Sequence, residues 1–196
     1  PEIFFFFFHI RATTTRFAAR GYAAVAPDTF ARVQPGVDLG YGQGDVATGR
    51  KLKAAVERLP EALVLGDIQA AIDEAAALSG GKVGLVGFCW GGLLAWRAAC
   101  ELQGLAAVAC YYGGGMTGDA EVARRPRCPV IAHFGAHDAH IPQKEVQAFA
   151  RAHPEVQVQV YDAAHGFNCD QRDSYDEAAA LVARERTLAL FARCVG

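Results

Sequence analysis

The chain has 196 residues, of which 52% are hydrophobic and 20% are charged, and this composition is typical of a globular protein rather than a disordered or fibrous one. A formal net charge of -2 gives no general attraction to nucleic acid or to an anionic membrane, which favours a small-molecule substrate. No apolar run reaches the roughly 18 residues of a membrane span. A chain of this length usually folds around one core, so we expect a single domain over residues 1–196.

The cysteines predict the compartment. None of the six belongs to a C-x-x-C pair, and a chain of this length does not need disulfides to fold, so we expect reduced thiols and a cytoplasmic protein. No secretory signal pattern opens the sequence. Because the chain starts as if inside an element, we expect N-terminal strands to be missing from it.

The hydrophobic pattern predicts alternating helices and strands along the chain. In chain order we expect a helix over 11–20, a strand over 22–26, a long Gly- and Pro-rich loop over 29–50, a helix over 61–78, a strand over 82–86, a helix over 91–102, strands over 105–111 and 129–134, a helix over 143–152, a strand over 156–161 and a helix over 175–193. This alternation predicts an α/β fold with a mostly parallel sheet and helices on both faces. Ligands of such sheets bind at the carboxyl ends of the strands.

The first chemical motif follows the strand predicted over 82–86. It reads Gly87-Phe88-Cys89-Trp90-Gly91-Gly92, which is a nucleophile elbow with cysteine in place of serine. A sharp turn exposes the nucleophile, and small residues two positions before and after it let strand and helix approach closely. The following helix N-terminus favours the Cys89 thiolate, and the Trp90 backbone N–H is a candidate oxyanion donor. The alternative is a Gly-rich turn that holds a buried structural cysteine.

A base and an orienting acid also occur after predicted strands. Asp138 follows the strand over 129–134, and His165 follows the strand over 156–161. The order nucleophile, acid, histidine is the order of α/β-hydrolases. We therefore predict a Cys89–His165–Asp138 triad on an α/β-hydrolase fold.

These motifs resemble the dienelactone hydrolase family of α/β-hydrolases over nearly the whole chain. The matching segments are Glu2-Ile3-Phe4, Arg20-Gly21-Tyr22-Ala23, Pro27-Asp28, residues 82–92 with the cysteine elbow, His133-Phe134-Gly135 with Asp138, His165-Gly166-Phe167 and Glu185-Arg186-Thr187. The resemblance implies that Glu2 contacts the resting thiol, and that the Ile3 backbone N–H is the second oxyanion donor beside Trp90. It also implies hydrolysis of a small ester or lactone with no metal or organic cofactor.

The substrate itself is left open. The founding enzymes of the family bind a substrate carboxylate with two arginines, and the matching positions here fall near Val46 and Cys169. Arg50 and Arg172 are close enough in sequence to substitute. Aromatic side chains also lie near the predicted crevice, and we expect Trp90 and Phe167 to contact the substrate.

Two alternative functions are a metal site and a redox-sensing thiol. His133, His137, Asp138 and His140 cluster within eight residues, but their placement on a strand and a turn argues against a shared metal ion, so we expect no metal site. A non-catalytic or redox-sensing protein would use the Cys89 thiol and would not need Asp138. The oligomeric state is left open, with a monomer as the default expectation.

Overall fold

The computed structural model describes residues 8–40 and 42–196, and the chain separates into two compact units, Pro1–Gly81 and Lys82–Gly196. The single domain expected over residues 1–196 stays a prediction. The described part of the N-terminal unit contains three helices: α1 (Phe8–Ala18), α2 (Gln43–Val56) and α3 (Glu61–Ser79). Helix α3 ends where predicted, because Gly80 adopts the left-handed conformation and its N–H bonds to Ala76 O.

Two predictions for the N-terminal unit are wrong. Residues 22–26 form no strand, although they are a short apolar run of the kind that strands contain. Such a run becomes a strand only where another strand pairs with it. Helix α2 begins inside the segment predicted as a loop, since glycines at its start hide a helical pattern in which Gly49, Leu52 and Val56 are buried.

The C-terminal unit is built on a four-stranded parallel sheet in the order β1-β2-β3-β4. Its elements in chain order are β1 (Val83–Phe88), α4 (Trp90–Glu101), β2 (Leu105–Tyr111), the short α5 (Asp119–Val122), β3 (Val130–Gly135), α6 (Gln143–Ala152), β4 (Gln157–Tyr161) and α7 (Glu177–Cys194). Every neighbouring pair of strands is parallel, so all four carboxyl ends lie at one edge. The predicted α/β architecture is confirmed, and only α5 was not foreseen.

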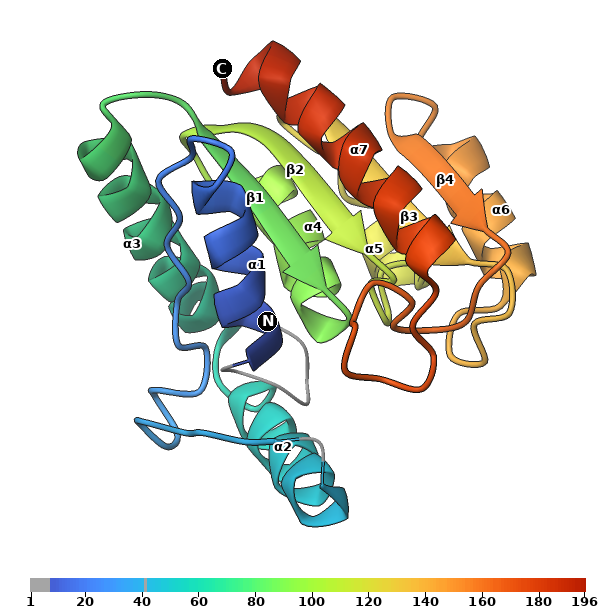
Figure 1. Cartoon of the computed structure of the whole chain (residues 1–196), viewed down its shortest axis with the longest axis horizontal. Coiled ribbons are helices and arrows are strands. Elements are labelled where there is room, and N and C mark those ends of the chain that lie inside the picture. The colour runs from blue at the N-terminus through green and yellow to red at the C-terminus, as the bar shows by residue number, and fades with distance from the viewer. Residues whose placement is uncertain (1–7, 41) are drawn as a thin grey trace. The chain divides into compact units, whose positions relative to one another are not determined.

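Helices cover both faces of this sheet. Figure 1 shows α7 crossing the front of the sheet, with α4 and α6 behind it. Helix α7 approaches β1 so closely that a Cβ on Gly84 would lie 2.8 Å from the Phe191 ring. The fully buried side chains of Trp96, Phe134 and Phe149 pack behind the sheet, with ring centroids 5.1 Å apart for Trp96 and Phe149. Most of β2 and all of β3 are therefore buried, as the centre of a parallel sheet requires, whereas the edge strand β4 is partly exposed.

Among the helices within residues 8–40 and 42–196, none combines the length and the apolar character that a membrane crossing requires.

Candidate active site

The carboxyl edge of the sheet brings the predicted nucleophile, acid and base together. Cys89 follows β1 directly, Asp138 lies shortly after β3, and His165 lies shortly after β4. All three residues are at least nine-tenths buried, with exposed fractions of 4%, 7% and 9% for the whole residue. The three predicted residues therefore lie at the ends of strands, as expected from the sequence, and at one edge of the sheet.

Cys89 has the strained backbone of a sharp strand-to-helix turn. Its φ of 53° and ψ of -121° lie in a region of backbone conformation that residues other than glycine rarely adopt, and adopting it costs about 1–3 kcal/mol. The backbone N–H of Cys89 donates to Tyr111 O at 2.9 Å, which ties the turn to the end of β2. A Cβ on Gly87 would overlap the Gly91 carbonyl and lie 2.8 Å from Ala95 Cβ. The turn therefore needs glycine at position 87.

A continuous hydrogen-bonded chain joins the three side chains. His165 Nε2 lies 3.2 Å from Cys89 Sγ, and His165 Nδ1 lies 2.7 Å from Asp138 Oδ2. The other oxygen of Asp138 accepts from the His140 backbone N–H at 2.8 Å. Because an ionised carboxylate only accepts, Asp138 fixes the Nδ1–H form of His165 and leaves Nε2 facing the thiol.

The same contacts set the charge preference of the base. Burial alone would lower the pKa of His165, but the hydrogen bonds to Asp138 and Cys89 outweigh it and raise that pKa to about 9. Because the contact with Cys89 is one cause of this rise, the proton shared between Cys89 and His165 lies readily on His165, which can later deliver it to a leaving oxygen.

Aromatic rings surround the base. The Tyr112 ring centroid lies 5.1 Å from that of His165 and 5.3 Å from that of Phe167. The ring of His140 meets His165 edge-on, also at 5.1 Å. Tyr112 itself has φ 36°, a second strained residue at this edge. These contacts restrict the motion of the His165 ring.

The remaining predicted site residues divide into two groups. Trp90 is the first residue of α4, so its N–H belongs to the helix end that faces Cys89, while its side chain is 2% exposed. Phe167 is fully buried against Tyr112. Glu2 and Ile3 lie outside the described residues. Substrate contact by Trp90 and Phe167, and the roles of Glu2 and Ile3, stay predictions.

The histidines that resembled a metal cluster point to different places. His133 is fully buried and bonds to Tyr161 and Thr187, whereas the exposed His137 pairs with Asp162 at 2.5 Å. Within the described part of the chain, no three His, Cys, Asp or Glu side chains are grouped as metal ligands.

The structure adds residues that sequence reasoning missed. Tyr112 and His140 both contact the base, and each follows a predicted strand, which is the signal that could have identified them. Arg172 also lies at the site, because a Cβ on Gly166 would lie 2.7 Å from its guanidinium carbon, directly beside His165 in the chain. Arg50 belongs to α2 of the other unit.

Comparison with known proteins identifies the family. A model of the dienelactone hydrolase family matches residues 3–195. The chain belongs to the dienelactone hydrolase family. As a member of this family it is a hydrolase with the α/β-hydrolase fold, and the resemblance drawn from the elbow, acid and histidine motifs is confirmed.

Individual relatives agree with this assignment to the dienelactone hydrolase family. A carboxymethylenebutenolidase of Pseudomonas putida is 36% identical over 194 residues, covering 95% of this chain and 80% of that protein. A provisionally named dienelactone hydrolase of Klebsiella pneumoniae superposes with a TM-score of 0.81 at 32% identity, covering 98% of this chain and 84% of that one. A metagenomic dienelactone hydrolase-like promiscuous phosphotriesterase has a TM-score of 0.78 at 22% identity, a likeness of fold alone.

Proposed function

We propose that the protein hydrolyses a small ester or lactone through a covalent intermediate on Cys89. The observation that carries the proposal is the unbroken chain from Cys89 Sγ through His165 to Asp138, at 3.2 and 2.7 Å. A protein that only senses oxidants with this thiol would not need an acid behind the histidine. The buried Asp138 therefore favours hydrolysis over redox sensing.

The first half of the reaction forms a thioester. His165 Nε2 takes the Cys89 proton while Sγ bonds to the substrate carbonyl carbon, and the carbonyl oxygen becomes an oxyanion. The Trp90 N–H, and by family resemblance the Ile3 N–H, donate to that oxyanion. When the carbon–oxygen bond breaks, His165 returns the proton to the leaving oxygen.

The second half releases the enzyme. His165 takes a proton from water as the water oxygen attacks the thioester carbon, and the carbon–sulfur bond then breaks. The leaving sulfur recovers a proton from His165, and the carboxylic acid product loses its own proton to solvent. No metal or organic cofactor enters this scheme, and Glu2 has the proposed role of disfavouring thiolate charge at rest.

The side chain of Arg172 bears on which substrate the site prefers. The guanidinium of Arg172 packs beside Gly166, the residue that follows His165, where it would donate hydrogen bonds to a carboxylate on the substrate. We propose that a lactone with a carboxylate is preferred over its neutral ester, with Trp90 and Phe167 as apolar contacts.

Replacement of Cys89 by alanine tests the mechanism. We expect Cys89→Ala to abolish steady turnover of an aryl ester and of a small lactone, because the covalent path is deleted while the fold is kept. Mass spectrometry of the wild type should detect an acyl group on Cys89. Cys89→Ser is the matched variant and should be strongly impaired, since a hydroxyl ionises much less readily than a thiol. Wild-type rates in well-folded Cys89→Ala would overturn the proposal.

A further inference from the structure

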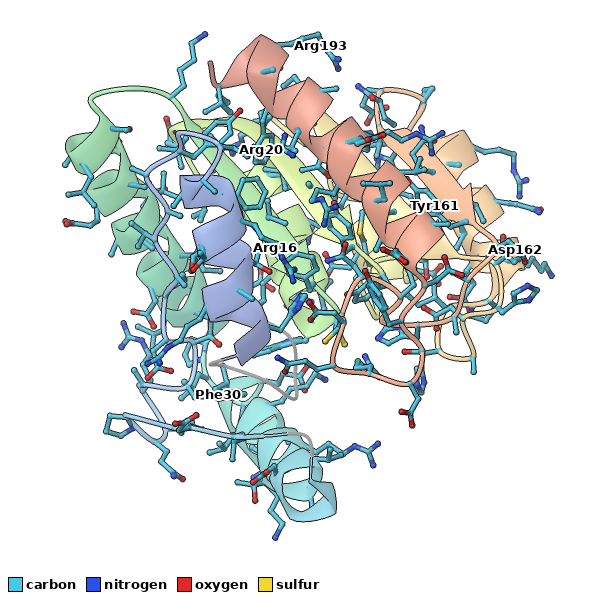
Figure 2. The ribbon with its side chains drawn as sticks, in the orientation of Figure 1. Arg16, Arg20, Phe30, Tyr161, Asp162 and Arg193 are labelled. Carbon is cyan, nitrogen blue, oxygen red and sulfur yellow. The ribbon has the colours of Figure 1, made fainter. Side chains whose placement is uncertain are left out.

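A row of buried polar side chains crosses the sheet immediately below the catalytic loops. Tyr111 ends β2, His133 lies in β3 opposite Tyr111, and Tyr161 ends β4. Thr187 and Arg186 of α7 meet these three side chains, and Tyr161 is labelled beside α7 in Figure 2. Thr187 and His133 are fully buried, and Tyr111 is 3% exposed. Arg186, by contrast, is exposed at the end of the row. We call these five residues the positioning row.

The hydrogen bonds of the positioning row form one connected set. A guanidinium only donates, so Arg186 Nη1 donates to the Tyr161 hydroxyl at 3.2 Å. The Tyr161 hydroxyl also lies 2.9 Å from His133 Nδ1, and His133 Nε2 lies 3.0 Å from Thr187 Oγ1. The Thr187 and Tyr111 hydroxyls are 2.7 Å apart. Each member therefore depends on the orientation of its neighbour.

This pattern requires a neutral imidazole with a single proton. Burial, and to a smaller extent the charge of Arg186, lower the pKa of His133 to about 3. The ring therefore stays neutral at physiological pH. A neutral ring donates through one nitrogen and accepts through the other, and each hydroxyl partner can take the matching role.

The backbone of the same row holds the loops that carry the acid and the base. The carbonyl oxygen of Tyr161 accepts from Ala136 N at 2.7 Å and from Ala163 N at 2.8 Å. Ala136 begins the segment that leads to Asp138, and Ala163 begins the segment that leads to His165. The starts of both loops are therefore hydrogen-bonded to the backbone of Tyr161, whose side-chain hydroxyl is bonded within the row.

The other two strand ends make equivalent contacts. Tyr111 O accepts from the backbone N–H of Cys89 at 2.9 Å, and His133 O accepts from that of Tyr112 at 2.7 Å. Tyr112 is the ring that packs against His165. The backbone at Cys89 and at Tyr112 is thus bonded directly to members of the row.

From this geometry we infer that Thr187, His133 and Tyr161 act as positioning residues, which hold the carboxyl ends of β2, β3 and β4 at the height that brings Asp138 and His165 together. None of them touches the reacting atoms. The expected effect of the row on kcat rests on the proposed function, whereas its expected effect on the Asp138–His165 contact does not. The simpler alternative is that the row only attaches α7 to the sheet, in which case its loss lowers stability and leaves the site unchanged.

Thr187 offers a test with a matched control. Thr187→Val keeps the shape of the side chain and removes the hydroxyl that joins His133 to Tyr111, while Thr187→Ser keeps the hydroxyl. Tyr161→Phe breaks the row at its other end and serves if Thr187→Val does not fold. For each protein we would measure kcat and KM with an aryl ester, the temperature of unfolding, and the titration of the isotope-labelled His165 ring by NMR.

We expect Thr187→Val and Tyr161→Phe to lower kcat on the order of tenfold with KM nearly unchanged, because a small displacement of the acid–base pair is costly in the transition state. Weakening the Asp138 contact should also lower the pKa of His165 from about 9 toward its ordinary value. Thr187→Ser should restore both properties. A lowered unfolding temperature with wild-type kcat and a wild-type His165 titration would overturn the inference. A shifted titration with unchanged turnover would keep the positioning role and refute the catalytic role proposed for His165.

Discussion

The contact between Asp138 and His165 controls the charge of the base. Burial disfavours the imidazolium, and the hydrogen bonds to Asp138 and Cys89 reverse that effect, so that the pKa of His165 is raised to about 9. In the proposed mechanism the leaving oxygen needs a proton from His165, so activity should fall as the pH rises through this value. The contacts of His165 with Asp138 and Cys89 therefore set the alkaline limit expected of the proposed reaction.

Asp138→Asn should therefore change both the rate and the pH profile. We expect kcat to fall by roughly two to four orders of magnitude, because an amide no longer holds the Nδ1–H form of the ring. The alkaline limb of kcat/KM should move to lower pH, since burial then dominates the pKa of His165. Rates with an aryl ester between pH 5 and pH 10 measure both effects.

Asp162→Asn is the matched control for this experiment. Asp162 lies at the same edge of the sheet, but its side chain is 94% exposed and pairs with His137. Its neutralisation should leave the pH profile unchanged. A profile for Asp138→Asn that coincides with the wild type would remove Asp138 from the mechanism.

At the scale of elements, α7 begins with a specific cap. Asp176 is the N-cap residue, and its side chain accepts from Ala179 N at 2.8 Å. Its own N–H donates to Phe167 O at 3.0 Å, which ties the helix start to the histidine loop. The cap therefore fixes where α7, with Thr187, meets the sheet.

Removal of this cap should destabilise the protein by a predictable amount. Asp176→Ala should lower the free energy of unfolding by about 1 kcal/mol, measured by urea denaturation, because a helix N–H loses its acceptor. Asp176→Ser should recover most of the loss. Asp173→Ala, at an exposed position of the same loop, is the control. Equal urea midpoints for Asp176→Ala and Asp173→Ala would show that the cap contributes nothing.

The elements of the C-terminal unit were largely predictable from sequence. Helix α6 has the predicted bounds, and each strand lies within two residues of its prediction, because apolar runs in a parallel sheet are bounded by glycine, proline and charge. In the N-terminal unit the run over 22–26 fails as a strand, since pairing is not a local property. Helix α2 was missed because Gly42, Gly44 and Gly49 obscure its start.

The candidate site was predictable in part, for a physical reason. Cys89, Asp138 and His165 could be located because each follows a strand in the order that the fold demands. The positioning row could not, because Thr187 and His133 are far apart in sequence and meet only through the packing of α7 on β3.

On the scale of the whole molecule, His133 makes stability depend on pH. The pKa of His133 is about 3 in the folded protein and should be near 6.5 when the chain unfolds. Between these values the unfolded state binds more protons, so this contribution to stability is complete above pH 6.5 and is lost as the pH falls toward 3. The raised pKa of His165 acts in the opposite sense, since its contribution is complete below pH 6.5 and is lost as the pH rises through about 9.

We therefore expect maximal stability near neutral pH and a loss of about 3 kcal/mol from His133 between pH 7 and pH 4. His133→Gln should be less stable at pH 7 but should show a flatter acid limb, because glutamine does not titrate. Denaturant unfolding of the wild type and of His133→Gln between pH 7 and pH 4 measures the acid limb of the stability profile for each protein. Parallel acid limbs in the two proteins would contradict the assignment to His133.

The backbone at Cys89 has a consequence for how the sequence evolves. At φ 53° and ψ -121° any residue with a Cβ atom is strained, and glycine would relieve the strain. Selection for stability alone would therefore drive this position toward glycine and erase the thiol. Because Cys89 carries this backbone cost, its presence is better explained by a need for the thiol, as in the proposed mechanism, than by the stability of the turn.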